Sequence, residues 1–141
     1  MTTKVSSLPK VYAHCDVPCG VYEPDSMRWA VETCEKMVDK LLHLELPANG
    51  DKQAYIDYHN TFSRGVSVKE EYAEIAKKQV LILWTDYFKP EHLQKWPDLH
   101  QKIWMATKQC SVVKRTVNMD EVRKLRTMIE EIATIFAESK K

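Results

Sequence analysis

A chain of 141 residues is long enough to bury one hydrophobic core and too short for two domains of ordinary size. Its 21 basic and 20 acidic side chains give a formal charge of +1, which provides no basic surface of the kind that binds nucleic acid. The apolar runs, such as VLILW at 80–84, are far shorter than the roughly 18–20 residues that span a bilayer, and the first 13 residues lack the apolar region of a secretory signal. We therefore expect a cytoplasmic protein with no nucleic-acid partner and no membrane association.

The first distinctive segment is HCDVPCGVY at 14–22, which follows a 13-residue stretch, MTTKVSSLPKVYA. We call residues 14–22 the hook and residues 1–13 the prefix, a removable leader. Pro18 lacks an N–H and fixes its own φ, so the hook is not expected to be helical. A turn around Pro18 would bring the thiols of Cys15 and Cys19 to one side.

From residue 24 onward, apolar side chains recur at intervals of three and four, the spacing of amphipathic helices. Four helices are predicted, at 25–45, 51–88, 97–115 and 119–138. The predicted buried positions are Met27, Val31, Cys34, Val38 and Leu41 in the first, Phe62, Val66, Ala73, Ala76, Val80, Leu83 and Tyr87 in the second, Leu99, Ile103, Ala106, Cys110 and Val113 in the third, and Val122, Leu125, Ile129, Ile132 and Phe136 in the fourth. Short links between such helices predict an all-α, antiparallel up-down-up-down four-helix bundle at the C-terminal side of the hook.

Two features of the second predicted helix need separate treatment. A kink is expected near Gly65, and Pro90 should end the helix. The VLILW run at 80–84 has a periodicity that also fits a buried strand, but no turn signal flanks it, which favours a helix.

Within the expected bundle, no pattern indicates a second reactive site. Cys34 and Cys110 fall in helical registers, where a free cysteine usually acts as a small buried hydrophobe. No H-x-x-x-H or Glu-x-x-His pair is present to build a metal site in the bundle core. We therefore expect surface or hydrogen-bonded side chains at the other histidines, which are His43, His59, His92 and His100. Any chemistry is expected in the hook.

Two thiols and an imidazole in the hook leave three kinds of chemistry open. They could form a reversible disulfide, bind zinc or iron, or bind a metal that accepts thiolates in a plane. A structural zinc site usually has four protein ligands and a second cluster of Cys or His, which the sequence lacks. A thioredoxin-type disulfide would use C-x-x-C beside a strand, and Cys15 and Cys19 do not fit that pattern.

The prefix favours the third kind of chemistry. Cleavage between Ala13 and His14 would create an α-amine that can lose its proton on binding a cation. That amine, the backbone nitrogen of Cys15 and the thiolates of Cys15 and Cys19 would form a planar N₂S₂ set, which suits Ni(II) or Cu(II). The His14 ring would approach from the axial direction, and the anionic donors would bring Ni(III) within reach.

The hook behind a short prefix resembles the nickel hook of nickel superoxide dismutases, and WTDYFKP at 84–90 resembles that family's second signature. The resemblance covers essentially the whole chain, up to its lysine-rich tail. It implies that superoxide is disproportionated to oxygen and hydrogen peroxide while a nickel ion alternates between Ni(II) and Ni(III). It further implies a homohexamer, and a protease that removes the prefix.

The resemblance also implies roles for the residues of the hook. His14 would supply amine and imidazole, Cys15 its backbone nitrogen and sulfur, and Cys19 the second sulfur, so these three are the metal ligands. Asp16 and Tyr22 would line the approach to the metal.

In the second signature, Asp86, Tyr87 and Lys89 would pack under the hook.

Lys89 is also the best candidate for drawing superoxide to the metal. Removing the prefix takes away Lys4 and Lys10, so 21 − 2 = 19 basic residues remain against 20 acids and the formal charge becomes −1. An anion would then have to be attracted by local cations.

The sequence departs from the family at two positions. Some members support the His ring with a Glu on the first helix and an Arg on the second, and these positions hold Ala30 and Tyr72 here. Arg64 is retained. The charged pair that supports the imidazole in those members is therefore absent here.

Two classes of function fit these observations. One is a nickel-dependent superoxide dismutase made as a precursor, and the other is a non-enzymatic bundle that binds and delivers nickel or copper. A carrier could use the thiols alone, whereas the enzyme needs the free amine of His14. We favour the enzyme.

Overall fold

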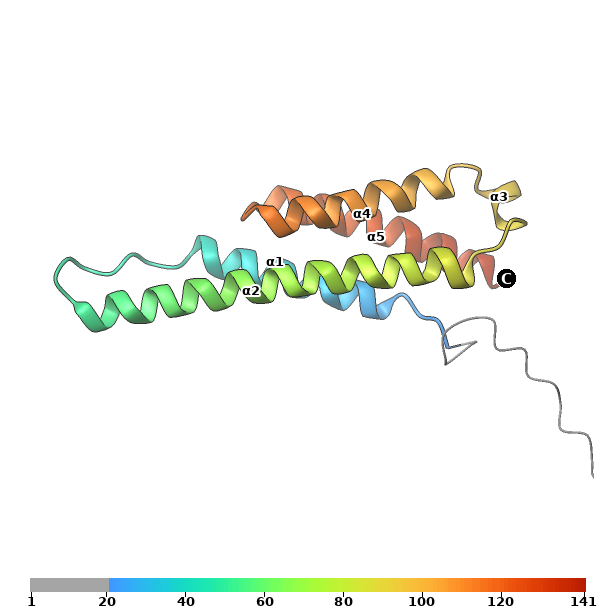
Figure 1. Ribbon diagram of the computed structural model, residues 1–141. Helices are drawn as coiled ribbons and strands as arrows, with labels where there is room; N and C mark the ends of the chain where they lie inside the picture. Colours follow the sequence, from blue (N-terminus) through green and yellow to red (C-terminus); the bar gives the residue numbers. More distant parts are fainter. Residues whose placement is uncertain (1–20) are drawn as a thin grey trace, which may run out of the picture.

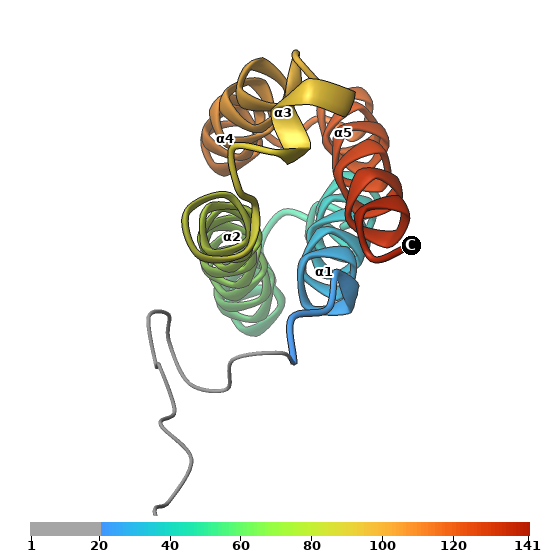
Figure 2. The same cartoon turned by 90° about the vertical axis from the view of Figure 1, so that its right-hand side faces the viewer.

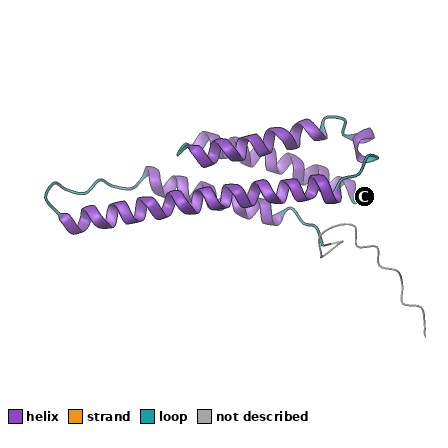
Figure 3. Cartoon of the chain, viewed as in Figure 1, coloured by secondary structure: helices purple, strands orange, loops and turns teal. Residues whose placement is uncertain are grey.

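The computed structural model describes residues 21–141 (Figure 1). Their helices are α1 (Asp25–Leu42), α2 (Lys52–Ile82), the π-helical turn η1 (Leu83–Tyr87), α3 (His92–Lys95), α4 (Leu99–Arg115) and α5 (Met119–Ser139). These residues contain no strand (Figure 3), so the all-α prediction is confirmed and the run at 80–84 is helical. No helix in the described part of the chain combines the length and apolarity needed to cross a bilayer.

The four long helices α1, α2, α4 and α5 form an antiparallel bundle with one helix at each corner (Figure 2). Each packs against its neighbour in sequence, and α1 packs against α5 to close the square. The predicted up-down-up-down topology is confirmed. It places the start of α1, the end of α2 and the end of α5 together (Figure 1), and we call this end of the bundle the hook end.

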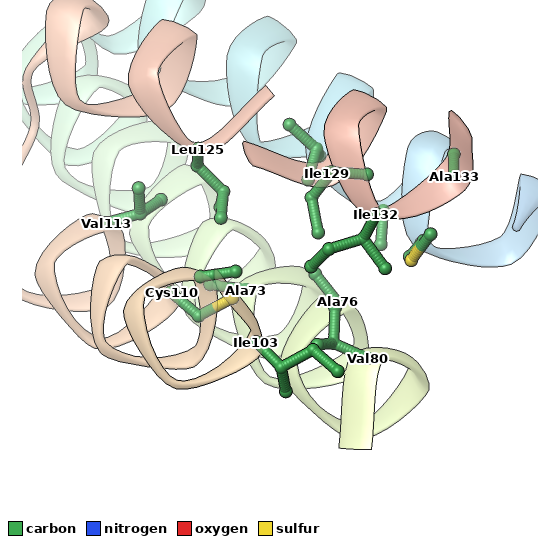
Figure 4. Packing of buried hydrophobic residues seen from close by; sticks show 14 of the residues in the cluster. Ala73, Ala76, Val80, Ile103, Cys110, Val113, Leu125, Ile129, Ile132 and Ala133 are labelled. Carbon is green, nitrogen blue, oxygen red and sulfur yellow. The ribbon is translucent and has the colours of Figure 1, made fainter. Parts of the chain in front are cut away.

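One continuous hydrophobic cluster fills the bundle (Figure 4). All the predicted core positions of α1, α4 and α5 are buried, because a three-four spacing keeps them on one face of each helix. The prediction is wrong for Phe62, whose side chain is 38% exposed. Phe62 lies in the first half of α2, and the N-terminal part of this helix extends past the ends of α4 and α5, which leave it uncovered (Figure 1).

Two ion pairs link α1 to α5. The Arg28 guanidinium donates to the Glu130 carboxylate, with Nη2 2.9 Å from Oε2, and this hydrogen bond raises the pKa of Arg28. Arg126 of α5 pairs with Glu35 of α1. Both pairs are partly exposed, so each stabilises the bundle by at most ~1 kcal/mol. Their main effect is to fix the register of α1, which leads directly from the hook.

The ends of two helices differ from the prediction. α1 ends at Leu42 and not at 45. The backbone N–H and the ring Nδ1 of His43 both bond to the carbonyl oxygen of Asp39 and close the last turn. α4 begins at Leu99 and not at 97, and the Asp98 carboxylate pairs with Lys102 at 3.0 Å instead of capping the helix.

The second predicted helix, 51–88, is divided. α2 runs through Gly65 without a break, and a Cβ at this position would lie 2.9 Å from Cδ2 of Leu41. The glycine therefore allows α1 and α2 to approach closely. After Ile82, the chain widens into η1, in which Phe88 N donates to Leu83 O at 2.9 Å. Such single π-helical turns often occur at functional sites. The short helix α3 that follows was not predicted.

The core contains one lysine, Lys69 of α2, which is 1% exposed. Its ammonium donates to the carbonyl oxygens of Val113 and Lys114, both at 2.6 Å, at the end of α4. Burial lowers the pKa of Lys69, and the negative charge of the neighbouring Glu70 opposes this shift because it favours the charged ammonium. Since the carbonyls of Val113 and Lys114 have no partner within their own helix, Lys69 caps α4 from α2.

Cys34 and Cys110 are fully buried, which confirms their prediction as core residues. Burial raises the pKa of the Cys34 thiol to about 11 and that of Cys110 to about 12. Only a thiolate is a good nucleophile or metal ligand, so both side chains are inert at neutral pH.

We expect an alkylating reagent at pH 8 to modify Cys34 and Cys110 only after unfolding. Mass spectrometry of the folded, metal-free chain should then find at most two adducts, on Cys15 and Cys19, and four adducts in denaturant. The raised pKa values keep the core thiols protonated until the pH approaches about 11. An adduct on Cys34 or Cys110 under native conditions would contradict this account of the core.

Candidate metal centre

The structure begins at the base of the hook. Four of the predicted site residues lie outside the described residues, namely His14, Cys15, Asp16 and Cys19. The structure does describe Tyr22 and Lys89, together with Asp86 and Tyr87 of the second signature.

Tyr22 packs against Tyr87 at the hook end of the bundle. Their rings meet edge to face, with centroids 5.9 Å apart and an interplanar angle of 61°. Tyr87 also lies against Phe136 of α5, at 4.5 Å between centroids, and stacks with His92 at 5.9 Å. Edge-to-face and offset aromatic pairs are favourable beyond the area that they bury. The base of the hook therefore lies directly on the second signature, where the resemblance places Tyr87.

The Tyr87 hydroxyl is oriented by the last turn of α5. Its oxygen lies 2.8 Å from Oγ of Ser139. Ser139 Oγ also donates to the carbonyl of Phe136 at 2.7 Å. A serine has one hydroxyl proton, and Ser139 uses it in the hydrogen bond to the Phe136 carbonyl. The Tyr87 hydroxyl must therefore be the donor in its hydrogen bond with Ser139.

Two histidines hold Trp84 and Lys89 of the second signature. Trp84 Nε1 donates to Nδ1 of His100 at 2.7 Å, and the backbone N–H of Lys89 donates to Nδ1 of His92 at 3.0 Å. These bonds fix η1 relative to α3 and α4. They also confirm that His92 and His100 are hydrogen-bonded side chains.

Lys89 and Asp86 differ in their exposure to solvent. Lys89 is exposed, and within residues 21–141 its ammonium has no ion-pair partner. Asp86 is half-buried in η1. The position of Lys89, two residues after Tyr87, leaves a positive charge at the hook end that no described carboxylate neutralises.

The two positions at which the chain departs from the family hold no charged pair. Ala30 is fully buried in α1. Tyr72 of α2 meets Trp29 of α1 edge to face, with ring centroids 5.0 Å apart. An aromatic contact between α1 and α2 thus occupies this region. Arg64 lies 18 residues before the end of α2, about 27 Å along the helix from the hook end of the bundle.

Sequence reasoning missed the contribution of α5 to the site. Ser139 binds Tyr87, and Lys140 binds Tyr22, the last residue of the hook, and Glu23. Their spacing from Phe136, three and four residues, places all three on one helical face and is the signal that could have identified them.

The donor chemistry of the chain fits nickel only at the hook. Among residues 21–141, no group of three or more His, Cys, Asp or Glu side chains could hold a metal ion. The hook offers an amine after cleavage, an amide nitrogen, an imidazole and two thiols. Nitrogen and thiolate donors of this kind suit nickel.

Comparisons with known proteins identify a nickel-containing family. The family model for nickel-containing superoxide dismutase matches residues 9–140. The nickel superoxide dismutase of Streptomyces seoulensis is 37% identical over 132 residues, which cover 94% of this chain and 92% of the relative. That of Streptomyces coelicolor (strain ATCC BAA-471 / A3(2) / M145) is 38% identical over 131 residues, 93% of this chain and 91% of the relative.

Solved structures show the same fold. The native structure of a nickel superoxide dismutase has a TM-score of 0.76 at 36% identity and covers 91% of this chain and 100% of that one. An apo structure has a TM-score of 0.74 at 32% identity and covers 86% and 98%, respectively. The family match extends from the prefix through the hook to the end of α5, and this chain therefore belongs to the nickel-containing superoxide dismutase family.

Proposed function

We propose that this chain, a nickel-dependent superoxide dismutase, holds its nickel ion in the hook through His14, Cys15 and Cys19. The observation that carries the proposal is the family match over residues 9–140, which includes the whole hook. The described part of the chain offers no alternative metal site. The match also favours the enzyme over a nickel or copper carrier, since both curated relatives are named as dismutases.

The chain's own residues bind the metal and prepare its approach. When bound, nickel supplies a one-electron couple between Ni(II) and Ni(III), by which two superoxide ions and two protons become one O₂ and one H₂O₂. His14 contributes its amine and ring, Cys15 its backbone nitrogen and thiolate, and Cys19 its thiolate. Asp16 and Tyr22 line the approach of superoxide to the metal. The ring of Tyr87 packs edge to face against that of Tyr22 and supports it.

The prefix, in this proposal, controls when the site forms. While Ala13 is attached, the nitrogen of His14 is a peptide amide, which is a far poorer donor than an amine. A protease that cuts before His14 would create the amine and remove a chain segment that crosses the site. Premature capture of metal by the two thiolates is thereby reduced.

We further propose that the enzyme is a cytoplasmic homohexamer. The projecting α1–α2 hairpin carries exposed apolar side chains, namely Leu42, Leu46, Tyr55, Ile56 and Phe62. A group of large apolar side chains on a surface often marks a protein interface. Light scattering that finds a monomer at micromolar concentration would contradict the assembly.

The ligand roles predict that Cys15→Ser or Cys19→Ser abolishes superoxide consumption by the chain that begins at His14. Nickel content should fall with it, while the free energy of unfolding of the metal-free chain changes by less than ~0.5 kcal/mol, because both thiols lie outside the buried core. Cys34→Ala is the matched control. It should keep nickel and activity but lower stability by about 1 kcal/mol, since it leaves a small cavity. A hook variant that unfolds or stays active would make the hook structural.

Lys89→Glu should slow the reaction most at low salt. The mature chain is slightly acidic, so local cations must attract the anionic substrate, and steering falls as salt screens the charge. We expect a three- to tenfold loss of kcat/KM at low ionic strength, based on the roughly 10–10³-fold range of whole-protein steering. Lys124→Glu is an exposed control near the start of α5, at the opposite end of the bundle. A loss that does not depend on ionic strength would exclude steering by Lys89.

A further inference from the structure

We infer that the last turn of α5 positions the hook, with Lys140 as the positioning residue. The inference rests on the proposed function, because it assumes that the hook binds nickel. It adds a role for the C-terminal end of the chain, which lies near the start of α1 at the hook end of the bundle (Figure 1).

Lys140 holds the last residue of the hook, Tyr22, and the residue that follows it, Glu23. Its ammonium donates to the backbone carbonyl of Tyr22 at 3.2 Å and to Oε1 of Glu23 at 3.0 Å. These partners are 118 and 117 residues away in sequence. The bond to Tyr22 is to the main chain, so Lys140 restrains the path of the backbone as well as the side chain of Glu23.

The Lys140 side chain is itself restrained, although it is 42% exposed. Its ammonium lies 4.3 Å from the centroid of the Phe136 ring, one turn earlier on α5. Phe136 is buried against Tyr87. Three favourable contacts, a cation–π pair, an ion pair and a hydrogen bond to the main chain, thus select one arrangement of a flexible side chain.

Ser139, the residue before Lys140, binds Tyr87, the second ring of the aromatic pair. Ser139 accepts from the Tyr87 hydroxyl, while Lys140 holds the backbone of Tyr22, and the two tyrosine rings touch. Consecutive residues of α5 therefore set the position of the hook relative to the second signature. Lys141 has no such role, since only its backbone N–H is bonded, to Glu138.

This anchoring matters for metal binding because Tyr22 is only three residues from Cys19. Three residues span at most about 10 Å, so fixing Tyr22 confines the second thiolate. A ligand segment restrained before binding loses less conformational entropy when it closes around the ion. Loss of the Lys140 ammonium should therefore weaken nickel binding without unfolding the bundle.

The test compares Lys140→Met with Lys141→Met in the chain that begins at His14. Methionine keeps an unbranched apolar stem over Phe136 and removes the charge. Chelator competition measures the nickel dissociation constant, and deuterium exchange of the metal-free chain measures protection at residues 21–25. Lys140→Met should raise the dissociation constant about fivefold, the effect of a partly exposed charged contact, and increase exchange at residues 21–25. Lys141→Met should match the unmodified chain, and both variants should keep its unfolding temperature.

A double-mutant cycle tests whether Lys140 acts through Glu23. Glu23→Gln alone should give part of the loss in nickel affinity, and adding it to Lys140→Met should give little more, because the partner charge is already gone. Fully additive losses, unchanged affinity and exchange in Lys140→Met, or an equal loss in Lys141→Met would each overturn the inference. If the unmodified chain binds no nickel, the proposed function fails, and deuterium exchange still decides whether Lys140 holds residues 21–25.

Discussion

The contact between the rings of Tyr22 and Tyr87 joins the two parts of the chain that the site requires, the hook and the bundle. Three neighbouring features of the hook end support this contact, namely Phe136, Ser139 and η1. The ring of Phe136 packs against that of Tyr87, and Ser139 accepts a hydrogen bond from the Tyr87 hydroxyl. The π-helical turn η1 carries Tyr87 and directs it toward the start of α1. The antiparallel topology makes this possible, because it brings the first residues of α1 and the last of α5 to the same end. A bundle with an odd number of helices would separate them.

The fold also separates the cysteines by environment. Cys34 and Cys110 lie in a dry core where burial holds their pKa values near 11 and 12, so they remain thiols. The hook cysteines, Cys15 and Cys19, come before the first helix in the sequence. An enzyme whose product is hydrogen peroxide benefits from this division, since peroxide oxidises thiolates far faster than buried thiols. In the described part of the chain, both cysteines are thus kept unreactive.

The core was predictable because a three-four spacing depends only on neighbours along one helix, as in Met27, Val31 and Cys34. Phe62 was misassigned because the same spacing says nothing about where the facing helices stop. η1 and α3 were missed since a π-helical turn has no distinct periodicity. Lys140 could not be found by pattern, as its partners are more than a hundred residues away. The hook was recognised through its donor atoms and its family resemblance.

The central claim is that the amine of His14 is a metal ligand which the prefix withholds. Nickel content and superoxide consumption, measured side by side for chains that begin at Met1, Ala13 and His14, test it most directly. The account predicts one nickel ion per chain and rapid consumption only for the chain that begins at His14. The two longer chains should fold with the same helix content, hold nickel weakly and show no activity. Full activity from the chain that begins at Met1 would contradict the claim.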